Sequence, residues 1–193
     1  KDKGNAPGFI NNFIAEITKP TITWKDKLRN LTASHFKGRY TFRRPNRREG
    51  STGMRLPSRM PKKEGAIIMI DTSGSISDAE INQFVSECVG IMNYCGAPWV
   101  KIYLHDVLCY HSESYSKSTI INLPVTRGGT SHVDVFDKVL DSEDKIGCIV
   151  AFTDLYTTFP NRHVPYPVIW AHPKSGEDQK VPFGNKVLIK LGE

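Results

Sequence analysis

The sequence predicts an α/β protein with a three-layer, doubly wound (Rossmann-like), mostly parallel sheet, preceded by a helical and basic N-terminal extension. Two continuous apolar runs, residues 65–70 and 146–153, have the length of buried parallel strands, and each is followed by an aspartate. Helical spacing of apolar residues occurs between the strand patterns. This alternation is typical of a parallel sheet covered by helices on both faces.

The later elements follow from the same reasoning. They are, in order, a helix over 77–95 with Ser77 as its N-cap, strands over 99–104 and 107–110, a helix over 131–140, a strand over 146–153, and strands over 168–172 and 187–191. Both predicted central strands are followed by an aspartate, at the edge where ligands collect in sheets of this kind.

Charge divides the 193-residue chain into two expected domains. Residues 1–64 contain 16 Lys and Arg against 5 Asp and Glu, a net charge of +11, whereas residues 65–193 contain 10 against 15, a net charge of −5. Within the extension, helices are expected over 8–19 and 24–36, followed by an irregular basic connector over 38–63.

Composition excludes some classes of protein. A hydrophobic content of 39% suits a packed core, and no apolar run approaches the roughly 20 residues of a membrane-spanning helix. The four cysteines form no CxxC pair or zinc pattern, which favours reduced, structural thiols in a cytoplasmic protein. The sequence begins at Lys1 and not at an initiator Met, and no signal peptide follows, so we expect a fragment of a longer protein.

The loop after the first strand has the composition of a cation site. Asp71, Ser73 and Ser75 place one carboxylate and two hydroxyls at alternate positions, and Gly74 allows a tight turn between them. Hard oxygen ligands suit Mg²⁺, Mn²⁺ or Ca²⁺. The alternative is that the serines only cap the following helix.

Two further segments carry a family resemblance. Thr130 follows two glycines, and Asp154 closes the second buried strand. Together with the DxSxS loop, they resemble the metal-ion-dependent adhesion site (MIDAS) of von Willebrand factor A (VWA) domains. The resemblance implies a divalent cation, expected to be Mg²⁺, and an open coordination position that captures an acidic side chain of a protein partner. The implied ligands are Asp71, Ser73, Ser75, Thr130 and Asp154.

Three segments before the first strand point to a more specific group of similar proteins: KPTITWKDKL, RRPNRR and RLPS. These are similar to bacterial and phage proteins in which a metallopeptidase-like domain precedes a VWA-like domain. No HExxH pair occurs here, so catalysis is not expected within this fragment, and any peptidase centre would lie upstream. The family also suggests an AAA+ ATPase as partner. One departure is Leu155, where many relatives have Gly after the aspartate.

His132 and Asp134 follow Thr130 closely and are candidates for the periphery of the cation site. The alternative is that both face water at the start of the helix. His105 and His111 flank a predicted turn and are expected at the surface, because no third ligand completes a zinc site. A serine hydrolase is disfavoured, since no GxSxG motif surrounds Ser73 or Ser75.

The basic connector supports a second interpretation. Its arginines accompany Tyr40 and Phe42, a combination that can bind phosphate backbones and stack on bases. Docking on the acidic body, or contact with a protein, is the favoured alternative to nucleic acid. The candidate basic patch consists of Arg43, Arg44, Arg47 and Arg48.

Overall fold

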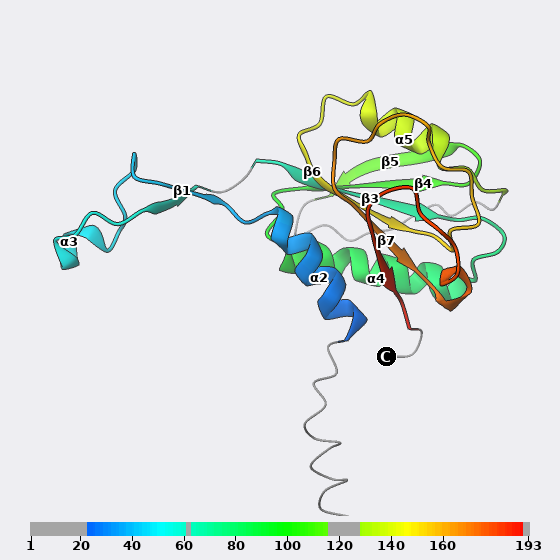
Figure 1. The fold of residues 1–193 in the computed structure, drawn as a ribbon, viewed down its shortest axis with the longest axis horizontal. Coiled ribbons are helices and arrows are strands. Elements are labelled where there is room, and N and C mark those ends of the chain that lie inside the picture. The colour runs from blue at the N-terminus through cyan, green and yellow to red at the C-terminus, as the bar shows by residue number, and fades with distance from the viewer. Residues whose placement is uncertain (1–22, 61–62, 116–127, 191–193) are drawn as a thin grey trace, which may run out of the picture.

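The six-stranded sheet forms the centre of the molecule. A computed structural model describes residues 23–60, 63–115 and 128–190. The strand order is β5-β4-β3-β6-β7-β8, and all neighbours are parallel except β5, which runs antiparallel to β4 at one edge. The expected α/β fold with a mostly parallel sheet is confirmed (Figure 1).

Most elements of the sheet and its helices lie close to the predicted ranges, but the strand predicted over 107–110 extends to Tyr115, because it pairs with the preceding strand as far as Val100. The elements are β3 (Gly65–Asp71), α4 (Asp78–Tyr94), β4 (Val100–His105), β5 (Cys109–Tyr115), α5 (Val133–Leu140), β6 (Ile146–Phe152), β7 (Val168–His172), η1 (Lys174–Gly176) and β8 (Asn185–Leu188). The last strand begins and ends earlier than the predicted 187–191, because it pairs with β7 through Asn185 and Leu188. The predicted helix over 8–19 lies outside the described residues.

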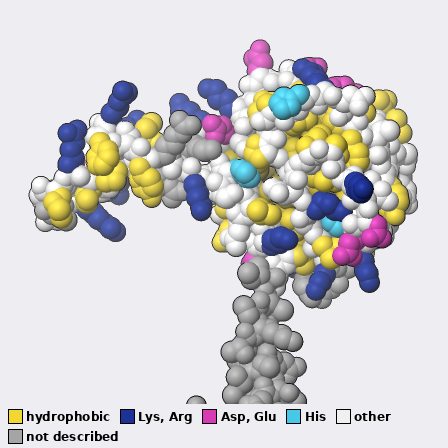
Figure 2. All heavy atoms as spheres, in the orientation of Figure 1, with side chains coloured by type: hydrophobic (Ala, Val, Ile, Leu, Met, Phe, Trp, Pro, Cys, Tyr) yellow, Lys and Arg dark blue, Asp and Glu magenta, His cyan; other side chains and the backbone are white. Residues whose placement is uncertain are grey.

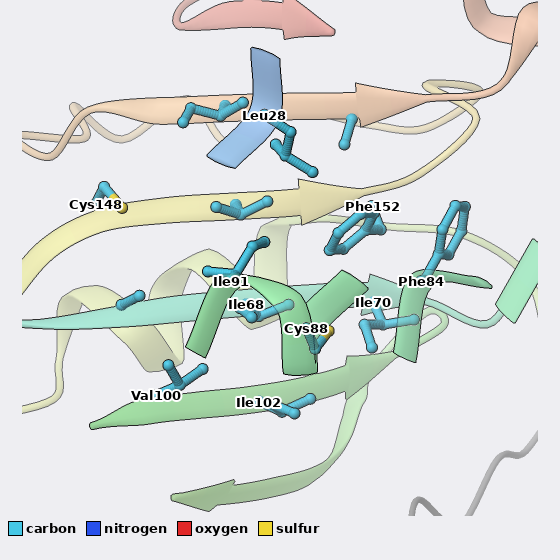
Figure 3. Close-up of a cluster of buried hydrophobic side chains, with 14 of the residues drawn as sticks. Leu28, Ile68, Ile70, Phe84, Cys88, Ile91, Val100, Ile102, Cys148 and Phe152 are labelled. Atoms are coloured by element: carbon cyan, nitrogen blue, oxygen red, sulfur yellow. The ribbon is translucent and has the colours of Figure 1, made fainter. Parts of the chain in front are cut away.

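The central strands β3, β6 and β7 are buried on both faces of the sheet, as the alternation of side chains along β3 shows. Ile68 and Ile70 point into a cluster beneath α2 (Trp24–His35) and α4, whereas Ile67 and Met69 point to the opposite face, covered by α5. In the first cluster Phe84 stacks on Phe152 with a centroid distance of 4.9 Å (Figure 3). The result is the three-layer arrangement that the apolar runs predict.

Local sequence explains where the first helices begin and how they pack. Ser77 caps α4 in a capping box with Glu80, as its position before the helix predicts. Helix α2 contacts α4 through an ion pair between Arg29 and the buried Glu87, 2.9 Å apart. Because Leu28 of α2 is fully buried in the first cluster, this N-terminal helix shares the core of the sheet domain.

The basic connector is more ordered than the sequence predicts. Strands β1 (Arg39–Thr41) and β2 (Ser58–Met60) pair antiparallel, and α3 (Glu49–Thr52) lies between them. The prediction of an irregular segment over 38–63 is therefore wrong for this part, because Arg39–Thr41 and Ser58–Met60 pair as strands across the residues between them. We call residues 38–60 the basic arm; it projects from the body in Figure 1.

The structure also bears on the predictions for the cysteines and for membrane-spanning helices. Cys88 and Cys148 are buried in the first cluster, where they act as small hydrophobic side chains, as predicted. Across the part of the chain that the structure describes, no helix has the length and apolar character needed to cross a membrane.

Candidate metal centre

Asp71 and Asp154 lie at the carboxyl edges of two adjacent parallel strands. Ile70 of β3 pairs with Phe152 of β6, so Asp71 and the residues after Phe152 leave the sheet side by side. The chain crosses from β3 to β4 on one side and later enters β6 on the other. This is the switch point at which doubly wound sheets bind ligands.

The loop after β3 folds around its own carboxylate. The backbone N–H of Ser73 donates to Asp71 Oδ1 at 2.9 Å, and the hydroxyls of Ser73 and Ser75 lie 3.1 Å apart. Asp71 and Ser73 are buried, whereas Ser75 is exposed. The loop thus brings three candidate oxygen ligands together, with one side open to solvent.

The loop that carries Thr130 contacts the first loop through backbone atoms. The N–H of Gly74 donates to the carbonyl of Gly128 at 3.1 Å, and the N–H of Ser131 donates to the carbonyl of Asp106 at 2.9 Å. Thr130 lies half-buried between these two anchors. Among the described interactions, its side chain has no hydrogen bond to the other four candidate ligands.

The second carboxylate affects the first electrostatically. Burial raises the pKa of Asp71 from 3.8 to about 6; hydrogen bonds from Ser73 and Thr153 oppose this rise, and the charge of Asp154 adds to it. Asp154 is 4% exposed, and its Oδ1 accepts from the N–H of Tyr156 at 3.1 Å. Two buried carboxylates close enough to repel each other are an environment that a cation would stabilise.

The candidate ligand atoms of this site are all carboxylate or hydroxyl oxygens. In the described segments no three His, Cys, Asp or Glu side chains converge as metal ligands, so a zinc-type cluster is not found there. Two carboxylates and neighbouring hydroxyls instead match the ligand preference of Mg²⁺, Mn²⁺ and Ca²⁺.

Two histidines lie beneath the site. The expectation that His105 lies at the surface is wrong, and so is the alternative that His132 faces water, because both are fully buried, with ring centroids 4.7 Å apart. Burial lowers the pKa of His105 to about 4, and burial followed by the effect of His105 lowers that of His132 well below 6.5. Both rings are therefore neutral at physiological pH.

His132 approaches the site through a residue that the sequence analysis overlooked. Its Nε2 lies 3.2 Å from Thr153 Oγ1, and that hydroxyl donates to Asp71 Oδ2 at 2.9 Å. Thr153 directly precedes Asp154 at the end of a predicted strand, and this position is the sequence signal that could have marked it as part of the site.

Asp134 has other partners. Its Oδ2 accepts from the N–H of Cys109 at 2.7 Å and lies 3.0 Å from Lys138 Nζ. Although burial raises the pKa of Asp134, these two partners lower it overall. None of the candidate ligands is among its described contacts, so Asp134 connects α5 to β5.

Leu155 adopts an uncommon backbone conformation. With φ 67° it is, within the described ranges, the one residue other than glycine in the left-handed region. Its side chain is 2% exposed and packs in the cluster beneath α5. Packing of the side chain thus offsets the strain of a turn in which many VWA relatives place Gly.

The strained backbone at Leu155 predicts that the larger truncation costs less stability: glycine should be tolerated better than alanine at this position. Leu155→Ala should lower the free energy of unfolding by about 2–4 kcal/mol through lost packing. Leu155→Gly removes more atoms but should cost about 1 kcal/mol less, because Gly accepts a positive φ freely. Urea unfolding of both variants measures the difference, and a glycine variant less stable than the alanine variant would contradict the strain.

The fold is that of an α/β domain with a mostly parallel six-stranded sheet, and the comparisons identify its family. The chain belongs to the family described as VWA-like domain (DUF2201), whose model matches residues 66–190. Residues 1–60 match a second model, described as "Putative metallopeptidase domain".

One relative is an uncharacterized protein of Thermotoga maritima. It is 31% identical over 150 residues, which cover 75% of this chain and 36% of the relative. The chain thus spans about a third of the length of that curated relative. No solved structure gave a significant match.

Proposed function

We propose that this domain binds a divalent cation, most simply Mg²⁺, and uses it to capture an acidic side chain of a protein partner. The observation that carries the proposal is the buried Asp71 at the switch point, beside Asp154 and the paired hydroxyls of Ser73 and Ser75. Membership of the VWA-like family supports it. Thr130 would supply a further hydroxyl from the adjoining loop.

The residues have separate roles in this proposal. Asp71 is held by hydrogen bonds to both of its carboxylate oxygens, so little reorganisation is needed when a cation arrives. Ser75 lies on the exposed side, where a partner has access. A bound cation would supply positive charge and a free coordination position, which a partner carboxylate can fill.

The capture step predicts binding that needs both the cation and the partner's negative charge. Immobilised peptides that contain Asp or Glu should retain the protein in Mg²⁺ and release it in EDTA, whereas peptides with Asn or Gln at the same positions should not retain it. Asp71→Ala should abolish retention. Retention that is equal in EDTA, or equal on the amide peptides, would contradict capture through a metal.

The match over residues 1–60 supports an association with a metallopeptidase. In this proposal the VWA-like domain presents a substrate protein to a peptidase centre outside the described residues, and an AAA+ ATPase is a candidate partner. In a protein with the complete metallopeptidase domain, Asp71→Ala should slow cleavage of a folded substrate but not of a short peptide. Equal effects on both substrates would exclude a role in presentation.

The basic arm favours nucleic acid as a second candidate partner. Tyr40 and Phe42 are 71% and 57% exposed, and Figure 2 shows basic and hydrophobic side chains together on the arm. Arg44 and Arg47 form no ion pair with any described residue, so their charges could serve a partner, while docking of the arm on the acidic body stays a prediction.

Nucleic-acid binding through the arm predicts a salt-dependent affinity for single-stranded DNA or RNA. A variant with four arginines changed to Ala should bind at least about tenfold more weakly, while Asp71→Ala should bind as the wild type does. Fluorescence anisotropy at several salt concentrations measures this. Unchanged affinity in the arginine variant would exclude the arm. The four positions are Arg43, Arg44, Arg47 and Arg48.

A further inference from the structure

The hydroxyl of Thr153 has three hydrogen-bond partners, and its chemistry determines the direction of each bond. Thr153 Oγ1 lies 2.9 Å from Asp71 Oδ2, 3.1 Å from the N of Leu155 and 3.2 Å from His132 Nε2. A hydroxyl has one proton to donate and two lone pairs that accept. The backbone N–H of Leu155 must donate to it, and the ionised carboxylate of Asp71 must accept from it.

The remaining lone pair of Thr153 faces His132, so His132 must donate from Nε2. This assigns the Nε2–H tautomer and leaves Nδ1 without a proton. Nδ1 is fully buried and has no hydrogen-bond partner in the described structure. A proton on that atom would be an unsatisfied donor, which is costly in a buried position.

The imidazole of His132 is held in place by the rings around it. Its centroid lies 4.7 Å from that of His105, 5.5 Å from Trp170, 6.0 Å from Phe159 and 6.5 Å from Phe136. The backbone is also fixed, because the N–H of His132 donates to the carbonyl of Thr158 at 3.1 Å. The ring therefore keeps Nε2 directed at Thr153.

We propose that His132 is a positioning residue of the candidate cation site and acts through Thr153. With both lone pairs of Thr153 engaged, the hydroxyl proton has one direction left, towards Asp71 Oδ2. The carboxylate is thus held in one orientation before any cation binds. This role in cation affinity rests on the proposed function, but the hydrogen-bond chain itself does not.

The tautomer can be measured without a metal. In ¹⁵N NMR spectra of the wild type in EDTA at neutral pH, His132 should carry its proton on Nε2. In Asp71→Asn the amide oxygen is needed by the N–H of Ser73, so the amide N–H₂ faces Thr153. Thr153 must then donate to His132, and the proton should move to Nδ1. An Nδ1–H tautomer in the wild type would overturn the assignment.

Cation affinity tests the positioning role through a double-mutant cycle with Mn²⁺. Thr153→Val should weaken binding about tenfold or more, the usual effect of losing a group that orients a ligand, while Thr153→Ser retains the hydroxyl and the affinity. His132→Phe keeps an aromatic ring but loses the donor and should also weaken binding. Because His132 acts through Thr153, the double variant should bind no more weakly than Thr153→Val alone.

A control separates positioning from general stability. Val139→Ala removes buried atoms from the same cluster beneath α5, but Val139 is not among the rings that surround His132, so it should lower the melting temperature and leave the Mn²⁺ affinity unchanged. Wild-type affinity in Thr153→Val, or additive losses in the double variant, would overturn the positioning role. If the wild type binds no Mn²⁺, the proposed function is wrong, and the tautomer measurement alone decides whether the hydrogen-bond chain exists.

Discussion

Asp71→Asn should make the metal-free protein more stable at pH 7, by about 2 kcal/mol in its free energy of unfolding. A pKa of about 6 in the folded state, against 3.8 when solvated, corresponds to roughly 3 kcal/mol of destabilisation by the ionised carboxylate. The amide shifts the His132 proton to the buried Nδ1, which has no acceptor among the described residues, and this offsets about 1 kcal/mol of the gain. Addition of Mg²⁺ should stabilise the wild type and not the variant.

The pH dependence of this effect has a defined sign. Protonation of Asp71 favours the folded state; its stabilising contribution is complete below pH 3.8 and is lost as the pH rises through about 6. The stability difference between Asp71→Asn and the wild type should therefore be largest above pH 6 and shrink towards pH 4. Urea unfolding in EDTA at several pH values measures it.

Asp134→Asn is the matched control for Asp71→Asn. Asp134 lies in the same domain, but the hydrogen bond from Cys109 and the ion pair with Lys138 lower its pKa overall. Its replacement should destabilise the protein slightly, by less than about 1 kcal/mol, as for other solvent-accessible pairs. If both variants lower stability alike at pH 7, Asp71 is not under the electrostatic strain described above.

Gly176→Ala should destabilise the protein by about 3 kcal/mol and weaken cation binding as well. A Cβ at this buried position would overlap the carbonyl oxygen of Asp154 and lie 3.0 Å from its carbonyl carbon. Since these atoms belong to the backbone, relief requires the loop itself to move, and overpacking of this kind usually costs 1–3 kcal/mol or somewhat more. Asp154 would then be displaced from its place beside Asp71.

Gly50→Ala serves as the comparison. A Cβ at Gly50, in α3 of the basic arm, has no atom within 4 Å, so alanine should be neutral or slightly stabilising in that helix. Equal stability of the two variants in thermal unfolding would show that the loop at Asp154 accommodates a methyl group at no cost.

The sheet domain could be predicted from sequence because its signals are local. The apolar runs of β3 and β6 and the stripe of α4 each specify one element, and parallel pairing brings Asp71 and Asp154 to the same edge. The packing of α2 could not be predicted in the same way. The sequence shows that Leu28 belongs to an apolar stripe, but it does not show which surface covers that stripe.

The environment of the site depends on contacts that no local pattern encodes. His132 and Thr153 are 21 positions apart, and Thr153 and Asp71 are 82 apart, so their hydrogen bonds arise only from the topology. A histidine that opens a helix commonly faces water, and nothing near His132 in the sequence predicts the aromatic rings that bury it. The left-handed turn at Leu155 escapes prediction for a related reason, because tertiary packing overrides a backbone preference.

Titration of the protein with Mn²⁺, followed by electron paramagnetic resonance, tests the cation site most directly. The wild type and Asp134→Asn should each bind one ion, and excess Mg²⁺ should displace it. Asp71→Ala should bind none at the same concentrations. Equal binding by Asp71→Ala and the wild type, or no binding by the wild type, would contradict the assignment of Asp71 and its neighbours as a metal centre.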